Sequence, residues 1–301
     1  MDTGWRPLPF RLRHLVLMLS AFVSMAYSGG VYWDQAHPMS PNAPFHLPTS
    51  VADFRDHSIA GLAFASWLFA ILGAHEMGHY IACRVYRLHA SWPYFLPAPI
   101  FMFGTFGAVI RIHARIQDRR TLFDVAFAGP IAGFVVAVAA LVVGLSTAES
   151  VPAVLDSGPG IVYSLPWVGG WLAELLRPDE SLVMNGRLAA AWGGLLITVL
   201  NLFPAGQLDG GHIVYALSRR LHRWTSWLAI ALAAGAVAWS FVERHPPMYL
   251  LWVAILLWMR HRHPPLVYER SPLGALRIGL AVVALVMFVV CFTWFPVKIV
   301  D

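Results

Sequence analysis

Long apolar stretches separated by short polar segments make up most of the chain. A membrane-spanning helix needs roughly 20 mostly apolar residues, because the hydrocarbon core of a bilayer is about 30 Å thick. Seven stretches approach this length, and the sixth is the shortest. They lie near residues 14–33, 58–83, 122–145, 187–204, 224–242, 247–259 and 273–296. The pattern predicts an all-α polytopic membrane protein with about six to seven transmembrane helices.

The composition supports this prediction. Hydrophobic residues make up 58% of the 301 residues and charged residues only 12%, whereas soluble domains carry about 25% charged residues. These are too few charges to cover the two soluble domains that the length would allow. Cys83 and Cys291 lie far apart in apolar surroundings, which predicts two buried free thiols.

The positions of the basic residues predict an orientation. With the N-terminus in the cytoplasm and seven crossings, sixteen of the 21 Lys and Arg residues fall in cytoplasmic segments, as the positive-inside rule requires. The net charge of +5 is therefore explained by topology, and nucleic acid is not an expected partner. Many arginines, few lysines and no Ser-rich leader favour a prokaryotic plasma (inner) membrane. A cleaved signal peptide in the first stretch stays an alternative.

Polar and proline-containing segments divide the chain into three parts. Residues 1–57 are expected to form a first transmembrane helix and an outer loop, 58–220 a core membrane domain, and 221–301 the C-terminal transmembrane helices. The outer segment 146–186 has about 40 residues, too few for an additional folded domain.

The second stretch contains His75-Glu76-Met77-Gly78-His79, an H-E-x-x-H pattern. Ionisable residues inside a membrane are costly and usually functional. Positions i and i+4 share one face of a helix, so His75 and His79 can bind one metal ion. Glu76 lies one position further round the helix, within reach of a metal-bound water.

A catalytic zinc site normally has three protein ligands and one water. Asp209 is the strongest candidate for the third ligand, because it follows a helix broken at Pro204, and broken helices at membrane depth line cavities or protein interiors. His89 lies beyond the expected end of its helix and is a weaker candidate. The topology places the remaining glutamate candidates on the outer side: Glu149, Glu174 and Glu180.

Two motifs together resemble the site-2 protease family of intramembrane zinc metalloproteases, peptidase family M50. These are the H-E-x-x-H of residues 75–79 and an N-x-x-P-x-x-x-L-D-G pattern with Asn201, Pro204, Asp209 and Gly210 in register. Residues 118–130 also resemble the third core helix of the family. The resemblance covers about residues 55 to 220 and is strongest to the minimal branch without a PDZ module.

The resemblance implies one Zn2+ per chain, held by His75, His79 and Asp209, with Glu76 as general base. The implied substrate is a transmembrane protein, cut within or near a membrane-spanning segment in the lipid bilayer. It also implies an active site near the cytoplasmic side. The oligomeric state is left open.

Residues 91–112 contain several prolines and a β-branched run, and prolines are incompatible with a spanning helix. In the family, a similar segment is a membrane re-entrant β element whose edge pairs with an extended substrate, and Gly104, Phe106 and Gly107 match it. The alternative is an apolar loop that fills the bundle. Asn201 is expected to bond the substrate backbone or oxyanion, or else to hold the helix break together.

Several other residues are expected to have structural roles. The segment Gly129–Gly133 suits close helix packing, and Asp124 suits a cap or an ion pair. His212 is expected to be structural or to lie close to the metal, and His222 to belong to a cytoplasmic charged flank.

Two other functions fit the sequence less well. A CAAX-processing or HtpX-like metalloprotease would use a later glutamate as third ligand, and none lies at the right depth. A transporter or an inactive protease would show repeats or a lost catalytic residue, and neither is present.

Overall fold

The structure is a computed structural model that describes residues 8–32, 50–151, 160–247, 249–259, 266 and 272–300. Within these ranges most residues are helical. The helices are α1 (Leu12–Tyr32), α2 (Val51–Val85), α3 (Arg119–Ser146), α4 (Trp167–Leu176), α5 (Gly186–Asn201), α6 (Asp209–Leu217), α7 (Arg219–Val242), α8 (Leu250–Met259) and α9 (Ala275–Cys291). Part of the expected first outer loop, residues 33–49, lies outside the described residues.

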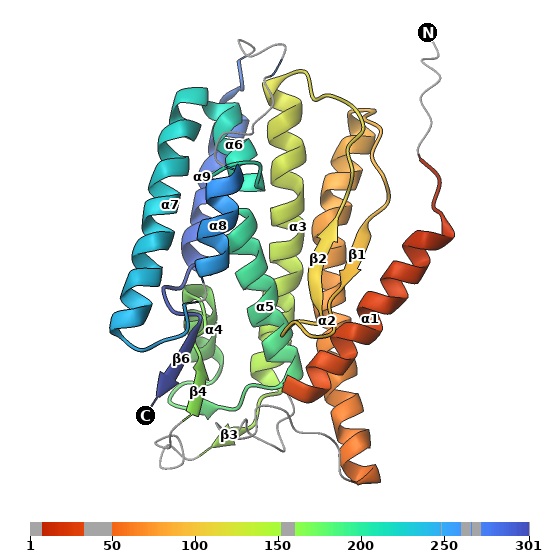
Figure 1. The fold of residues 1–301 in the computed structure, drawn as a ribbon, viewed down its shortest axis with the longest axis vertical. Coiled ribbons are helices and arrows are strands. Elements are labelled where there is room, and N and C mark those ends of the chain that lie inside the picture. Colours follow the sequence, from red (N-terminus) through yellow and green to blue (C-terminus); the bar gives the residue numbers. More distant parts are fainter. Residues whose placement is uncertain are drawn as a thin grey trace.

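Three short antiparallel pairs accompany the helices. They are β1 (Tyr94–Pro97) with β2 (Thr105–Val109), β3 (Ser150–Val151) with β5 (Ser181–Leu182), and β4 (Gly160–Tyr163) with β6 (Val297–Val300). The first pair lies beside α1 and α2, and the other two gather at the opposite end of the molecule from α6 (Figure 1). The β-structure expected within residues 91–112 is therefore present as a hairpin.

Four helices of the described ranges are long and apolar enough to cross a membrane. They cover Leu12–Val31, Phe54–Val85, Arg119–Ser146 and Arg219–Val242. The other three apolar stretches also form helices, but α5, α8 and α9 have only 16, 10 and 17 residues. The prediction of a mostly helical membrane protein is confirmed, whereas six to seven crossings stay a prediction.

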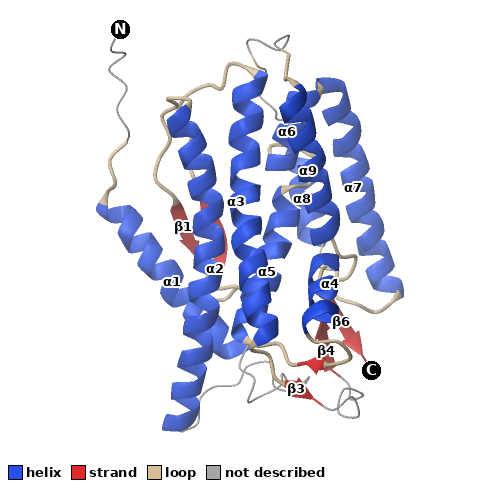
Figure 2. Cartoon of the chain, turned by 180° about the vertical axis from the view of Figure 1, so that it is seen from behind, coloured by secondary structure: helices blue, strands red, loops and turns tan. Residues whose placement is uncertain are grey.

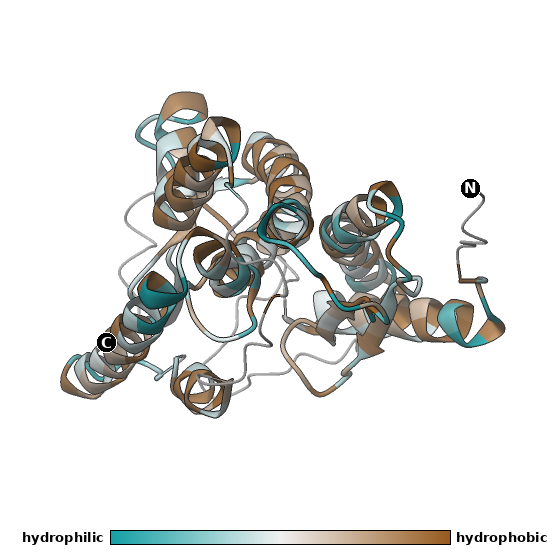
Figure 3. Cartoon of the chain, turned by 90° about the horizontal axis from the view of Figure 1, so that it is seen from above, coloured by the Kyte–Doolittle hydropathy of each residue, from teal (hydrophilic) through white to brown (hydrophobic). Residues whose placement is uncertain are grey.

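The helices α2, α3 and α5 form the centre of the bundle, with α1 on one side and α7, α8 and α9 on the other (Figure 2). Trp192 of α5, Phe64 of α2 and Phe123 of α3 are almost fully buried. Apolar residues also cover outward faces of the helices (Figure 3), for example Val135 and Leu285, which are 60% and 61% exposed. A lipid environment, not water, suits such faces.

Two structural expectations are met within the described residues. Cys83 and Cys291 are buried free thiols. Asp124 of α3 forms an ion pair with Arg277 of α9, with Oδ2 2.6 Å from Nη2, and also accepts a hydrogen bond from Tyr86, which directly follows α2. This carboxylate therefore joins α3 and α9 to the end of α2.

Candidate metal centre

His75, His79 and Asp209 lie together, although 130 residues separate His79 from Asp209. Oδ2 of Asp209 lies 3.2 Å from Nε2 of His75 and 3.3 Å from Nε2 of His79, and the two Nε2 atoms are 3.1 Å apart. Both imidazoles are buried. Among the described residues, this is the group of His, Cys, Asp and Glu whose ligand atoms all lie close enough for one metal ion.

These three separations fit a tetrahedral metal ion. Zinc binds imidazole nitrogen and carboxylate oxygen at about 2.0–2.2 Å, which places tetrahedral ligand atoms about 3.3 Å apart. Three electron-pair donors at these distances repel one another unless a proton or a metal ion lies between them. The donor set and its geometry therefore suit a divalent metal such as zinc.

The other ring nitrogen of His79 is bonded to the protein. Its Nδ1 lies 2.7 Å from the carbonyl oxygen of Val125 in α3, so the ring N–H donates to that carbonyl and Nε2 stays available for a metal. Histidine ligands usually have such a partner, which fixes their tautomer and orientation.

Close packing of α2 on α3 makes room for the imidazole. A Cβ atom at Gly129 would lie 2.1 Å from Nε2 of His79, far inside contact distance. Gly133, one turn later, faces the Cβ of His75. The close helix packing expected of Gly129–Gly133 is thus present, and it shapes the metal centre directly.

The three candidate ligands line a cavity with a volume of about 290 Å³. Glu76, Asn201 and His212 line the same cavity. The side chain of Glu76 is buried, and its carboxylate accepts a hydrogen bond from the backbone N–H of Ile110. Residue 110 directly follows β2. The hairpin therefore holds the carboxylate beside the three candidate ligands.

The hydrogen-bond pattern of β2 and of the residues that follow it explains why the N–H of Ile110 faces Glu76. Ser91 donates to the carbonyl oxygen of Arg111 at 2.9 Å, and His113 donates to that of His89 at 2.8 Å. Residues 111 and 113 thus bond the strand that leads into β1. The backbone N–H and C=O groups of successive residues point alternately to the two edges of a strand. Those of residues 108, 110 and 112 therefore point to the opposite edge, toward the cavity.

Asp209 is positioned by an irregular segment between α5 and α6. The helix α5 ends at Asn201, and a Cβ at Gly210 would lie 2.0 Å from the carbonyl oxygen of Leu202, so only glycine permits this tight return. Two side chains of α7 bind carbonyls of the segment. Thr225 donates to Pro204 at 2.8 Å, and Nε2 of His222 lies 3.0 Å from the carbonyl oxygen of Gly206.

His222 therefore differs from its expected place in a charged flank. It is only 6% exposed, because α7 turns this residue toward the bundle and not toward water. Its neighbours Arg220 and Arg223 are exposed, so the basic sequence around His222 wrongly suggested that this histidine is exposed too. Backbone carbonyls at membrane depth need partners of this kind.

The structure separates the expected substrate-binding residues into two groups. Asn201 lines the cavity, and its Nδ2 lies 3.5 Å from Nε2 of His75. Gly104, Phe106 and Gly107 are not among the residues lining the cavity. They lie at the turn end of the hairpin, where a Cβ at Gly104 would meet the backbone of Ser24 in α1. Ala108, Val109, Ile110 and Ile112 line the cavity in their place.

His89 is not part of the cluster. It is exposed, and its backbone carbonyl accepts from His113. Sequence reasoning missed the carbonyl of Val125, the N–H of Ile110, His222 and Thr225, because the first two contacts use backbone atoms and the last two residues look ordinary in sequence.

Comparison with known proteins agrees with the two motifs. The model of peptidase family M50 matches residues 63–237. A relative from Oryza sativa subsp. indica, named "Probable zinc metalloprotease EGY2, chloroplastic", is 33% identical over 198 residues, covering 64% of this chain and 34% of the relative. No solved structure matches the chain.

Two Arabidopsis thaliana proteins give a similar result. "Probable zinc metalloprotease EGY2, chloroplastic" is 30% identical over 208 residues, covering 66% of this chain and 35% of the relative. "Probable zinc metalloprotease EGY1, chloroplastic" is 28% identical over 238 residues, covering 76% of this chain and 42% of the relative. The chain thus spans about a third of the length of the first of these relatives. Since the family model matches more than half of the chain and includes both motifs, the chain belongs to peptidase family M50.

Proposed function

We propose that this protein is an intramembrane zinc metalloprotease that hydrolyses peptide bonds within or near transmembrane segments of other membrane proteins. The observation that carries the proposal is the buried trio of His75, His79 and Asp209 beside the carboxylate of Glu76, in a bundle with membrane-length helices. Membership of a peptidase family, and relatives named as zinc metalloproteases, support both the activity and the cofactor.

In this proposal His75, His79 and Asp209 hold one Zn2+. When bound, zinc lowers the pKa of a coordinated water toward about 7 and polarises the scissile carbonyl. Glu76 accepts the proton of the attacking water and returns it to the nitrogen of the leaving amine. The N–H of Ile110 keeps the carboxylate of Glu76 turned toward the cavity, and Val125 keeps the ring of His79 in place.

The β1–β2 hairpin supports a proposal for substrate presentation. A transmembrane helix keeps its amides hydrogen-bonded, so a bond can be cut only after local unwinding. The hairpin has two strands, and the second edge of β2 faces the cavity. An unwound substrate stretch can add to this edge through main-chain bonds, beginning near Ala108. Asn201 also lines the cavity and can donate to the substrate carbonyl.

Localisation is proposed at two levels. The apolar helices indicate an integral membrane protein. We further infer a prokaryotic plasma membrane, with a cytoplasmic N-terminus and an active site near the cytoplasmic side, from the distribution of arginines in the sequence. The curated relatives named above are chloroplastic, so a thylakoid or envelope membrane is the alternative that fractionation of the source cells would test.

The decisive experiment compares wild type with Glu76→Gln and Glu174→Gln in lipid vesicles that contain single-span test substrates. Glu174 is exposed on α4, so it provides the same chemical change away from the cavity. We expect Glu76→Gln to keep about one zinc per chain, measured by elemental analysis, and to lose cleavage by several orders of magnitude. Unchanged cleavage in Glu76→Gln, or no cleavage by the wild type of any substrate tested, would contradict the proposal.

A further inference from the structure

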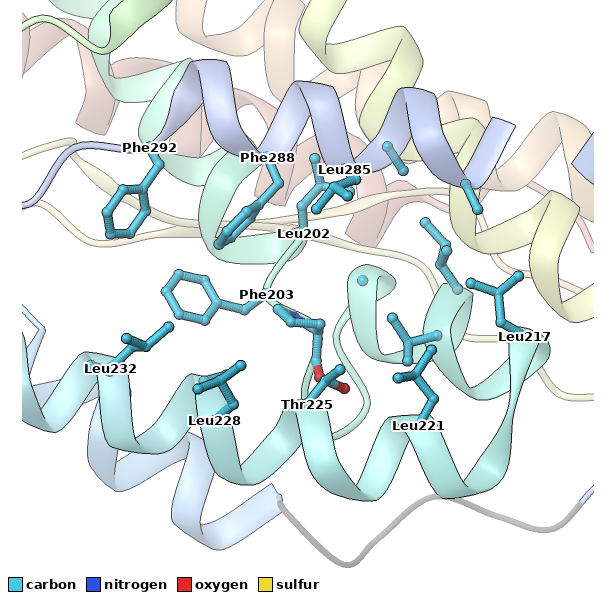
Figure 4. Close-up of a pocket in the computed structure, with 18 of the residues that line it drawn as sticks. Leu202, Phe203, Leu217, Leu221, Thr225, Leu228, Leu232, Leu285, Phe288 and Phe292 are labelled. Atoms are coloured by element: carbon cyan, nitrogen blue, oxygen red, sulfur yellow. The ribbon is translucent and has the colours of Figure 1, made fainter. Parts of the chain in front are cut away.

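A second, larger cavity of about 510 Å³ lies between α6, α7 and α9 (Figure 4). The segment that joins α5 to α6 separates it from the metal centre. Leu202, Phe203, Pro204 and Gly210 line the large cavity, while their chain neighbours Asn201 and Asp209 line the small one. An occupant of the large cavity would therefore contact the segment that carries Asp209.

The side chains that line this cavity offer few hydrogen-bonding groups to an occupant. Most of it consists of aliphatic and phenylalanine side chains, which Figure 4 shows facing one another from α7 and α9. Its two hydroxyl groups are already used. Thr225 donates to the carbonyl of Pro204 at 2.8 Å, and Tyr249 donates to that of Thr293 at 2.5 Å. The indole of Trp294 is the remaining polar side-chain group of the lining, so the cavity suits a hydrocarbon occupant.

The shape of the cavity limits the occupant further. Its lining follows α7 from Leu221 to Ala236, a length of about 22 Å at 1.5 Å per residue. The cavity is therefore long relative to its volume of about 510 Å³, and this elongated shape suits an extended hydrocarbon chain.

The cavity opens toward the surroundings of the bundle. Leu221, Leu228 and Leu232 of α7 line it and are nevertheless 44%, 59% and 48% exposed, and Leu285 of α9 is 61% exposed. In a bilayer these side chains face acyl chains, which are the hydrocarbon present at the highest concentration. An acyl chain can therefore enter sideways between α7 and α9.

The charges near one end of the cavity complement a phosphate group. Arg220 directly precedes Leu221 in the first turn of α7, and its side chain is exposed. Lys and Arg residues near a membrane surface attract anionic lipid headgroups. A phospholipid whose chain lies along α7 would place its phosphate at this end.

From these observations we propose that the cavity between α6, α7 and α9 binds one acyl chain of a bilayer phospholipid, with its phosphate beside Arg220. The bound chain supports the segment 202–208 from the side opposite the metal centre. The proposal concerns a site that takes no part in the hydrolytic chemistry, so it stands or falls independently of the proposed protease activity.

Photolabelling of the full-length protein tests this directly. The probe is a phosphatidylglycerol with a diazirine on one acyl chain, present as a minor component in nanodiscs of phosphatidylcholine. We expect labelled peptides from 202–217 and 281–294 in excess over lipid-exposed peptides of α1. Ala233→Phe and Ala284→Phe, which fill the cavity from two buried positions, should each reduce this labelling at least fivefold. Ala234→Phe, at an exposed neighbouring position outside the lining, should leave it unchanged.

Two controls keep the result decisive. If a filled variant does not fold, wild-type labelling must still be displaced in a saturable manner by unlabelled phosphatidylglycerol. Glu76→Gln and zinc-free protein should label like the wild type, so a failed protease assay does not affect this test. Equal labelling of all variants, non-saturable labelling, displacement by free fatty acid but not by phospholipid, or preferential crosslinking to a substrate segment would overturn the proposal.

Discussion

The two cavities on either side of residues 201–210 differ in size and in chemistry. The smaller one, about 290 Å³, is lined by three histidines, two carboxylates and two side-chain amides, whereas the larger one, about 510 Å³, has a mostly apolar lining. A short segment with a proline and several glycines forms part of both walls. The comparison shows that cavity size does not locate the chemistry in this protein.

The physical reason is the cost of polar groups at membrane depth. Ionisable side chains in an apolar bundle are retained where they pair with one another or bind an ion, so their convergence carries more information than volume. An apolar cavity carries no such cost, because hydrocarbon can fill it.

The largest effect is expected for Asp209→Ala. Loss of the third candidate ligand should reduce bound zinc to a small fraction of one ion per chain and abolish cleavage, because two imidazoles alone hold the ion weakly. Zinc content and cleavage should be measured together, with Asp56→Ala, at an exposed aspartate paired with Arg55, as the matched control. Full zinc and full activity in Asp209→Ala would remove it from the ligand set and reopen the case for His89.

Gly129→Ala should be nearly as damaging, although it adds one methyl group. The new Cβ would lie 2.1 Å from Nε2 of His79, so α3 or the imidazole must move. We expect zinc affinity to fall by about 100-fold, comparable to the loss of a residue that orients a metal ligand. Gly235→Ala on α7 meets open space and should raise stability by up to about 1 kcal/mol. Normal zinc affinity in Gly129→Ala would show that the helix contact does not shape the centre.

Ile110→Pro should separate catalysis from metal binding. Proline removes the N–H that bonds Glu76 and interrupts the edge proposed to bind substrate, so kcat/KM on membrane-embedded substrates should fall about tenfold to 100-fold while zinc is retained. Ile110→Val keeps the N–H and serves as control. Val109→Pro should instead weaken the hairpin itself, because residue 109 pairs with Tyr94. Unchanged cleavage in Ile110→Pro would eliminate both roles of this edge.

The smallest effect is expected for Thr225→Val. The variant loses the hydrogen bond to Pro204 at 2.8 Å and keeps nearly the same shape, so unfolding should become easier by about 1 kcal/mol, measured as a lower Tm. Thr225→Ser keeps the hydroxyl and should show less of this loss. Zinc content should stay near one per chain in both. A large loss of zinc in Thr225→Val would mean that the two sides of the segment are more tightly coupled than a single hydrogen bond implies.

The sequence by itself determined the features that depend on local spacing and composition. Seven apolar stretches predicted helices, and all seven are helical, because hydrophobic composition and length act within one segment. The H-E-x-x-H spacing brought His75 and His79 to one helix face, since positions i and i+4 always share a face. The break at Pro204 marked Asp209 because a proline removes a backbone hydrogen bond and so favours a kink or an end of the helix, although α3 continues through Pro130. Whether α5, α8 and α9 cross a membrane is not determined by composition, since they are shorter than the hydrocarbon core requires.

The tertiary structure decided which distant groups complete the site. The contacts of His79 with Val125, of Glu76 with Ile110 and of Gly206 with His222 join residues 46, 34 and 16 positions apart. All three use a backbone atom on one side, which every residue possesses, so residue type could not reveal those partners. The third also uses a histidine whose basic neighbours suggested a charged surface. The same holds for Gly104, at the end of the turn, and for Phe106 and Gly107 in β2, which do not line the cavity of the metal centre. Helix crossing and strand register determine these contacts, and both are properties of packing between elements that no single segment encodes.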